Sequence, residues 1–172
     1  VMQTPECLPA CIVGEPGIGK TNRLYQMAKA LELHLETIIA SIRSPEDFGG
    51  LGLPSEDFSR INRVPDGWFW RLKEKGKGIA FLDEISTSPP ATQAALLRVM
   101  LEGEVGDEKL PKDVKRIAAM NPPSSAAGGW EMALPLANRL WWVEWEAEAE
   151  LFVNWLNGRE VTTDDFIYVD LE

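Results

Sequence analysis

The nine residues VGEPGIGKT, at positions 13–21, decide the fold of this chain. They satisfy the pattern G-x-x-x-x-G-K-[ST], whose fixed positions are Gly14, Gly19, Lys20 and Thr21. Glycines let backbone N–H groups converge on an anion without obstruction by a Cβ atom, and a helix that starts here adds the positive end of its dipole. The lysine can reach the β- and γ-phosphates of a nucleotide, and the threonine hydroxyl can ligate Mg²⁺. The alternative is a purely structural role, in which these residues form a tight strand-to-helix turn without a ligand.

The residues on both sides supply the strand and the helix that this pattern requires. Residues 10–13 form an apolar run without polar alternation, which is typical of a buried strand. Between positions 20 and 33, Leu24, Met27, Ala28 and Leu31 recur with the spacing of a helix that covers a sheet. The residues that we expect to surround phosphates are Gly14, Glu15, Pro16, Gly17, Ile18, Gly19, Lys20, Thr21 and Asn22.

Strands and helices continue to alternate along the chain. Apolar runs predict strands at 35–41, 79–82, 114–120 and 139–145. Trp141, Trp142 and Trp145 of the last run are expected to pack in the core, and the alternative is an apolar partner surface at an exposed edge. A short helix, WFWRLKEKG, is expected at 68–76, and its large apolar residues are expected to pack. Residues 43–64 show no sustained period, which predicts a long loop or an irregular insertion.

A longer helix is predicted after the third strand. One of the serines within 86–88 can cap it, Pro89 or Pro90 fits its first turn, and Gly103 ends it. Its expected apolar stripe is Ala94, Leu97 and Leu101, with Leu96 and Met100 on its flanks.

This alternation predicts an α/β fold with a mostly parallel sheet, right-handed crossovers and helices on both faces. In such sheets ligands bind beyond the carboxyl ends of the strands. Asp83 and Glu84 stand at one of these ends, after the buried run IAFL. Beside a phosphate loop, the first acid can hold Mg²⁺ through its water shell and the second can orient an attacking water. The alternative is a solvated pair of acids at a strand end.

Two further polar residues are candidates. Asn121 ends the fourth strand and could contact the γ-phosphate or the attacking water, although an asparagine before a proline also favours a simple turn. Arg139 precedes the last strand and could supply a guanidinium to the phosphoryl group in the site of a neighbouring subunit. From its local pattern alone, Arg139 is an ordinary surface residue.

The composition of the chain argues against nucleic acid, a membrane span and a zinc site. The chain has 172 residues, 45% of them hydrophobic, and a formal net charge of −10, so nucleic acid is not an expected partner. No apolar stretch approaches the roughly 20 residues that span a bilayer, and we expect a cytoplasmic protein. With Cys7, Cys11 and a single histidine, His34, the chain cannot assemble a four-ligand zinc site.

Four segments together resemble the AAA+ ATPases of the MoxR-like and dynein-related branch. The segments are GEPGIGKT, IAFLDEIS with TQAALLRVMLEGEV, RIAAMNPP and LPLANRL. The resemblance implies a three-layer αβα P-loop NTPase with a five-stranded parallel sheet in the order 5-1-4-3-2. It also implies ATP and Mg²⁺ as cofactors, and a hexameric ring with nucleotide between neighbours.

The resemblance assigns roles to the candidate residues. Lys20 and Thr21 contact the phosphates and Mg²⁺, and Asp83 supports the metal. Glu84 is the catalytic base, Asn121 a sensor of the γ-phosphate, and Arg139 the finger that acts in trans. The nucleotide-binding core is expected over residues 1–146. Residues 147–172 hold one expected helix and an acidic tail, too short for the helical lid that the family normally carries.

Three functions follow as hypotheses. The first is Mg²⁺-dependent ATP hydrolysis coupled to remodelling or maturation of a protein partner. The second is a nucleotide-dependent assembly scaffold with negligible turnover, and the third is a motor associated with nucleic acid.

Overall fold

A five-stranded sheet forms the centre of the computed structural model, which describes residues 9–125, 130–146, 153–154 and 156–158. Neighbouring strands are parallel throughout, in the order β2-β5-β8-β1-β9. The strands are β1 (Ala10–Val13), β2 (His34–Ile39), β5 (Lys77–Asp83), β8 (Asp113–Met120) and β9 (Trp141–Glu144). Numbered along the chain from 1 to 5, these strands lie in the order 5-1-4-3-2, because β3, β4, β6 and β7 belong to two separate ribbons.

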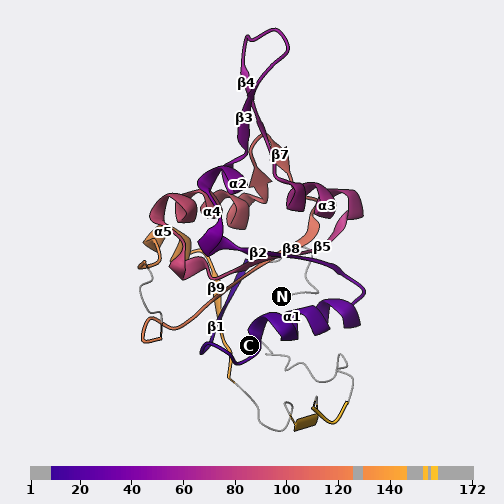
Figure 1. The fold of residues 1–172 in the computed structure, drawn as a ribbon, viewed down its shortest axis with the longest axis vertical. Helices are drawn as coiled ribbons and strands as arrows, with labels where there is room; N and C mark the ends of the chain where they lie inside the picture. Colours follow the sequence, from indigo (N-terminus) through magenta and orange to yellow (C-terminus); the bar gives the residue numbers. More distant parts are fainter. Residues whose placement is uncertain (1–8, 126–129, 147–152, 155, 159–172) are drawn as a thin grey trace.

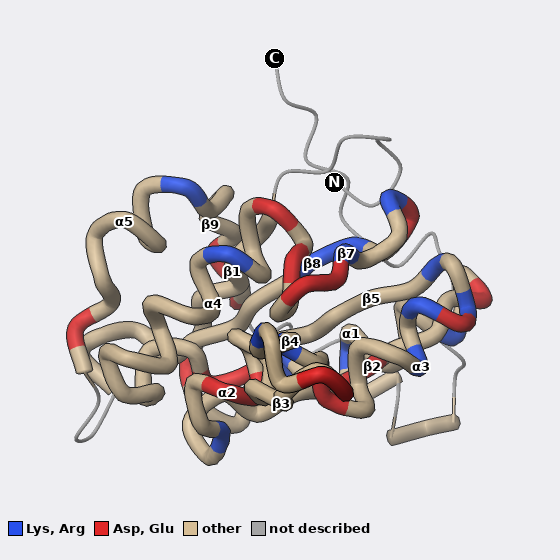
Figure 2. The backbone as a smooth tube through the Cα atoms, turned by 90° about the horizontal axis from the view of Figure 1, so that it is seen from above, with Lys and Arg blue, Asp and Glu red and all other residues tan. Residues whose placement is uncertain are grey.

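Helices cover both faces of the sheet and complete three layers (Figure 1). Helix α1 (Lys20–Ala30) lies on one face. The other face carries α2 (Pro45–Gly49), α3 (Gly67–Lys75), α4 (Pro90–Glu102) and α5 (Leu134–Ala137), with two short 3₁₀ segments, η1 (Ala40–Ile42) and η2 (Ile85–Thr87). Strand β5 is charged only at its two ends, as expected of a strand buried on both faces (Figure 2).

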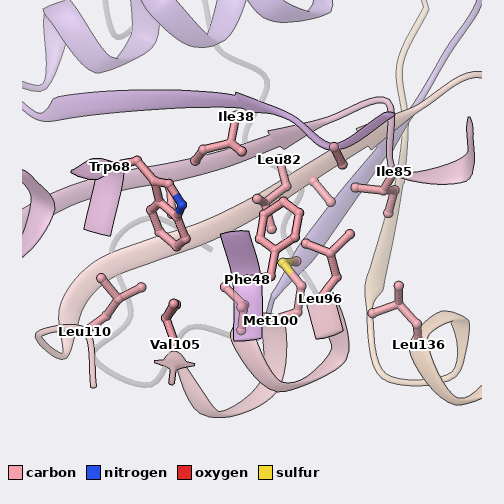
Figure 3. Close-up of a cluster of buried hydrophobic side chains, with 14 of the residues drawn as sticks. Ile38, Phe48, Trp68, Leu82, Ile85, Leu96, Met100, Val105, Leu110 and Leu136 are labelled. Carbon is pink, nitrogen blue, oxygen red and sulfur yellow. The ribbon is translucent and has the colours of Figure 1, made fainter. Parts of the chain in front are cut away.

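The side chains of the sheet alternate between two apolar clusters. In β5, Ile79 and Phe81 pack with Leu24 of α1, whereas Ala80 and Leu82 belong to the larger cluster on the other face. Figure 3 shows the larger cluster, whose labelled members are Ile38, Phe48, Trp68, Leu82, Ile85, Leu96, Met100, Val105, Leu110 and Leu136. The burial of Trp68, Phe69 and Leu72 confirms that these residues of α3 pack in the core, as expected, whereas Trp70 is 36% exposed.

The insertion at 43–64 is ordered, so its prediction as a long loop was wrong. Ser44 and Asp47 form a reciprocal capping box that starts α2. A hairpin of β3 (Leu51–Pro54) and β4 (Ile61–Val64) follows and projects away from the body of the molecule (Figure 1). The helix has five residues and each strand four, which is too short for a periodic pattern to show in the sequence.

A second ribbon supports the base of this hairpin. It consists of β6 (Glu104–Val105) and β7 (Glu108–Lys109). Arg63 of the hairpin donates its N–H to Asp107 Oδ2 at 2.7 Å, and the N–H of Asp107 donates to the Arg63 carbonyl at 3.0 Å. The hairpin is therefore fixed at its root and free of the body at its tip.

Helix α4 differs from its prediction in two respects. Pro89 is its N-cap without a side-chain cap, so none of the serines at 86–88 caps it. Ser88 Oγ donates instead to the Ile85 carbonyl at 2.6 Å. The buried face also lies elsewhere, and Ala94 of the predicted stripe is exposed. The residues that α4 buries are Thr92, Gln93, Leu96, Val99 and Met100.

The last strand, β9, lies at the edge of the sheet. Of the three tryptophans expected to pack in the core, Trp142 is 40% exposed and Trp141 is only partly buried, whereas Trp145, directly after β9, packs against the smaller apolar cluster. The helix predicted over 148–157 and the acidic tail lie mostly outside the described residues. The expectation that residues 147–172 are too short for a helical lid concerns the same part of the chain and stays a prediction. Among the helices of the described part, none is both long and apolar enough to cross a membrane.

Candidate functional site

The loop between β1 and α1 has the backbone that an anion-binding loop requires. Gly17 and Gly19 adopt φ values of 81° and 83°, in the left-handed region that a residue with a Cβ rarely enters. A Cβ at either position would have no heavy atom of the described chain within 4 Å. These glycines are therefore required by the backbone conformation and leave open space above the N-terminus of α1, where backbone N–H groups can bind an anion.

Gly14 is needed for a different reason, which is close packing. A Cβ there would lie 2.6 Å from the Trp145 carbonyl oxygen and 2.6 Å from Ile18 Cδ1. The Gly14 N–H also donates to the Met120 carbonyl at 3.3 Å. Gly14 therefore lets the loop pass between the carboxyl ends of β8 and β9.

Lys20 is at the centre of the site. Its Nζ donates to the carbonyls of Gly14 at 2.7 Å and Glu15 at 3.0 Å, and to Asn121 Oδ1 at 2.9 Å. Burial lowers the pKa of Lys20 from its usual value, and the nearby charges of Asp83 and Glu15 oppose this change. The ammonium group is thus held in place by three oxygens of the chain itself.

Thr21 and Asp83 bring two oxygens together on the open side of Lys20. Thr21 Oγ1 donates to Asp83 Oδ2 at 2.6 Å, across a separation of 62 residues in sequence. Asp83 Oδ1 accepts the N–H of Glu84 at 2.9 Å. A hydroxyl and a carboxylate are hard oxygen ligands, and Mg²⁺ commonly takes only one or two of them from protein in addition to water and phosphate. The described residues contain no cluster of three or more His, Cys, Asp or Glu side chains that could hold a metal alone.

Glu84 occupies a strained and exposed position at the end of β5. Its φ is 58°, in the left-handed region that few non-glycine residues enter. Its Oε2 accepts a hydrogen bond from Ser41 Oγ at 2.5 Å. Because Ser41 belongs to η1, directly after the edge strand β2, this contact joins the acid pair to the segment that leads into α2 and the projecting hairpin.

The remaining loop residues surround this centre. Glu15, Pro16 and Asn22 are exposed, and Ile18 is partly buried. Ser125, in the segment after β8, donates to Glu15 Oε2. The loop is therefore held against the end of β8 by a side-chain contact as well as by Lys20.

Arg139 is the one predicted site residue that the fold does not bring to this place. It lies just before β9, whose register pairs Trp141 with Ala10 and Glu144 with Val13. Because β1 and β9 are parallel, Arg139 is at the amino edge of the sheet and the phosphate loop is at the carboxyl edge. Its guanidinium is exposed and donates to the Pro135 carbonyl at 2.8 Å.

A cavity of about 960 Å³ opens at this amino edge. Its lining includes Lys112, Arg116, Arg139 and Trp141. Figure 2 shows basic positions at β7 and β8 and between α5 and β9, in a chain that is acidic overall.

The sequence analysis missed several residues that complete the site. Ser41 and Ser125 contact Glu84 and Glu15 across 43 and 110 residues of sequence, and no local pattern marks either serine. Gln93 was also missed, although a polar residue within an apolar helix segment is a signal for a buried hydrogen bond.

Comparisons with known proteins agree with the fold of this chain. A crystal structure of a candidate ATPase from Cytophaga hutchinsonii superposes with a TM-score of 0.62 at 19% sequence identity, covering 91% of this chain and 47% of that protein. NtrX from Brucella abortus superposes with a TM-score of 0.50 at 21% identity, covering 83% of this chain and 34% of that protein. At these identities the likeness establishes the fold, and the chain spans about half or less of either protein.

The sequence itself gives the more specific result. No curated protein matches the chain. The family model of the AAA domain (dynein-related subfamily) matches residues 9–140, which include every predicted site residue. The chain therefore belongs to the dynein-related subfamily of AAA domains.

Proposed function

We propose that this chain hydrolyses ATP in a Mg²⁺-dependent reaction, and that a ring of its copies uses the reaction to remodel or mature a protein partner. Membership of the AAA domain family implies nucleotide binding and nucleotide-dependent ATPase activity. The observation that carries the proposal is the convergence of Lys20, Thr21, Asp83 and Asn121 through hydrogen bonds of 2.6 to 2.9 Å. These residues come from α1 and from the ends of β5 and β8, so only the fold brings them together.

The loop and Lys20 bind the phosphates in this proposal. Three oxygens accept from Lys20 Nζ and hold it between the start of the loop and the end of β8. A γ-phosphate oxygen would compete with these acceptors for the ammonium protons. Asn121 then reports whether a γ-phosphate is present, because it shares Lys20 with that group.

The adjacent oxygens of Thr21 and Asp83 fit a magnesium ion, and they would hold it together with water and phosphate. Magnesium, when bound, would neutralise the negative charge that develops on the phosphates. Glu84 is the base that orients the attacking water. Since its carboxylate accepts from Ser41, Glu84 has to leave that hydrogen bond, or share it, to reach the water.

Arg139 acts in trans. It lies across the sheet from the loop of its own chain, in an exposed cavity with other cations. A head-to-tail arrangement of copies places the amino edge of one sheet against the carboxyl edge of the next, and such heterologous contacts close into rings. We propose a hexameric ring in which Arg139 contacts the γ-phosphate held by the neighbour.

The hairpin is the part of the chain that suits contact with a protein partner. Leu51, Leu53, Phe58 and Ile61 are between 44% and 81% exposed on it. Phe58, at the tip, has a φ of 57°, and the turn around it is held by Asp57, which accepts from Ser55 and Ser59. An ordered tip that exposes apolar side chains marks a contact surface. In a ring, this region would face the pore.

Phosphate release by the Glu84→Gln variant tests the reaction. We expect ATP binding to survive, because the loop, Lys20 and Asp83 are unchanged, and we expect turnover to fall by at least about 100-fold. Both are measured on purified full-length chain, by calorimetry for binding and by phosphate release for turnover. Hydrolysis at the wild-type rate would show that Glu84 is not the base.

The Ser41 contact favours a second candidate, a nucleotide-dependent assembly scaffold with negligible turnover. The Glu84 carboxylate accepts a hydrogen bond from Ser41 Oγ at 2.5 Å, so one of its oxygens is already engaged by the chain. The scaffold predicts that ATP changes the oligomer mass while little phosphate is released. Measuring mass and phosphate release with ATP, with ADP and without nucleotide separates the two functions.

A further inference from the structure

The segment that leads to Arg139 is attached to η2 and the start of α4 by hydrogen bonds, two of which involve the buried side chain of Gln93. Trp130 donates its N–H to the Ser86 carbonyl at 3.1 Å. Three residues later, Ala133 donates its N–H to Gln93 Oε1 at 2.8 Å. The segment 130–133 therefore lies along η2 and the first turns of α4, which directly follow Glu84.

Gln93 makes most of these attachments. It is 1% exposed, and its Nε2 donates to the carbonyls of Ser88 at 3.0 Å and Glu131 at 3.4 Å. Together with the bond from Ala133, all of these contacts are to backbone groups. A buried amide with such partners fixes their relative position, because each partner would lose a hydrogen bond if the segment moved.

One short helix, α5, connects the segment held by Gln93 to Arg139. Helix α5 begins at Leu134, directly after Ala133, and packs its buried Leu136 into the main core. The N–H of Arg139 donates to the Leu136 carbonyl at 3.2 Å, and its guanidinium donates to the Pro135 carbonyl. The place where the guanidinium lies thus depends on where Gln93 holds the entry to α5.

The side toward Glu84 depends on Gln93 much less. Thr87 donates its N–H to the Glu84 carbonyl at 3.2 Å and its Oγ1 to the same carbonyl at 3.0 Å. Ser88 donates to Ile85 through both its N–H and its hydroxyl. These local bonds keep η2 folded without the Gln93 amide.

We propose that Gln93 is a positioning residue that sets where Arg139 is presented to the neighbouring subunit. The inference rests on the proposed function, in which Arg139 acts in trans. It makes a directional prediction: loss of the Gln93 amide harms the subunit that offers Arg139 and spares the subunit whose own site hydrolyses ATP. A merely structural role for Gln93 would harm both.

Subunit mixing tests this direction. Chains with Glu84→Gln cannot hydrolyse ATP but still offer Arg139, and chains with Arg139→Ala keep a complete site but lack the finger. Their mixture should release phosphate faster than either chain alone, because mixed oligomers pair an intact site with an intact finger. Gln93→Met, which keeps the length of the side chain and removes its polar atoms, is then added to one partner at a time.

We expect Gln93→Met in the Arg139-offering chain to lower the rate of the mixture by about 10-fold or more, since misplacement of a reacting group by about 1 Å can cost 100-fold. The same substitution in the Arg139→Ala chain should change the rate less than about twofold. Thr92→Val is the matched control. Thr92 is equally buried on the same turn of α4, but its hydroxyl donates to the Arg43 carbonyl and not to the segment 130–133.

Equal loss in both arms, or loss in neither, overturns the inference. A directional loss with Thr92→Val that matches that of Gln93→Met also overturns it. If the mixture with intact Gln93 shows no gain, the trans role of Arg139 is wrong and the inference fails with it. Thermal unfolding checks that each chain is folded. Should Gln93→Met not fold, Gln93→Glu takes its place, because it keeps the acceptor for Ala133, and an intermediate directional loss is then expected.

Discussion

The two edges of the central sheet differ in how their functional groups are held. At the carboxyl edge, Lys20 donates to Asn121 and Thr21 donates to Asp83, and Lys20 is only 9% exposed. At the amino edge, Arg139 is exposed, and its guanidinium donates to a carbonyl four residues away. One edge is thus preorganised within a single chain, and the other presents a cation outward.

The difference between the two edges indicates which functional step depends on each of them. Groups that are preorganised around a ligand lose little order when the ligand binds, which favours nucleotide binding by the single chain. Arg139 lies at the opposite edge of the sheet from the loop of its own chain, which is the reason for proposing that it contacts the phosphate bound by a second copy. Variants at the carboxyl edge should therefore affect binding and chemistry, and variants at the amino edge should affect assembly.

Loss of Lys20 should have the largest effect. Lys20→Ala removes the charged donor of the phosphate site, and hydrogen bonds to charged groups contribute about 1.5–3 kcal/mol each, so we expect ATP affinity to fall by about 100-fold. Calorimetric titration with ATP measures it. Lys29→Ala, on the exposed last turn of the same helix, should bind as the wild type does. Wild-type affinity in Lys20→Ala would remove Lys20 from the site.

The pH dependence of ATP binding offers a second measurement of Lys20. Burial lowers its pKa below the usual value of 10.5. The ammonium form, which binds phosphate, is therefore present at lower pH and is lost as pH rises, at a lower pH than for an exposed lysine. Affinity should decline over this range in the wild type and not in Lys20→Ala.

Asn121→Ala should have the next largest effect, on turnover more than on affinity. Asn121 Oδ1 is one of the three oxygens that position Lys20 Nζ. Loss of one hydrogen bond to a charged group should lower kcat by about 10-fold. Steady-state phosphate release measures kcat and KM separately. Ser124→Ala, at an exposed position in the same segment, is the control, and an equal loss there would argue against a specific role for Asn121.

Ser41→Ala should change turnover in the opposite direction. It frees the Glu84 carboxylate from the hydroxyl that now donates to it, and an exposed hydrogen bond of this kind is worth about 0.5–1.5 kcal/mol. We expect basal phosphate release to rise by about two- to fivefold. Ser59→Ala, at the tip of the hairpin, should leave the rate unchanged. A lower rate in Ser41→Ala would mean that Ser41 positions Glu84 for catalysis rather than restraining it.

The smallest effect is expected at the amino edge. Lys112→Glu reverses one charge in the Arg139 cavity, and surface charges contribute up to about 1 kcal/mol, so oligomers should dissociate at about two- to fivefold higher concentration. Sedimentation at several salt concentrations measures this, and the difference from the wild type should shrink as salt screens the charges. Lys75→Glu, at the exposed end of α3, is the control. Equal assembly of both variants and the wild type would place the interface elsewhere.

Much of the carboxyl edge could be predicted because its signals are local. The strand β1 has the predicted bounds, and α1 and β5 differ from prediction only at their ends. Long apolar runs and the glycine pattern needed no knowledge of distant residues. The order of strands, in contrast, came from the resemblance to a family.

The short and edge elements could not be predicted. The buried face of α4 was wrongly predicted because it includes two polar residues, Thr92 and Gln93. Their burial depends on hydrogen bonds with Arg43, Ser88 and the segment 130–133, and hydrophobicity does not reveal it. Core packing was wrongly predicted for Trp141 and Trp142 because an edge strand buries less of its surface than a central one. Both outcomes depend on neighbours that are remote in sequence.

The sequence by itself determined the phosphate loop, since left-handed glycines, a lysine and a threonine are needed within nine consecutive residues, and a short stretch of backbone carries that requirement. Only the tertiary structure decided that Ser41 meets Glu84, that Gln93 holds the entry to α5, and that Arg139 lies on the opposite edge from the loop. Hydrogen bonds between residues tens of positions apart depend on the parallel register of the sheet, and no local pattern encodes that register.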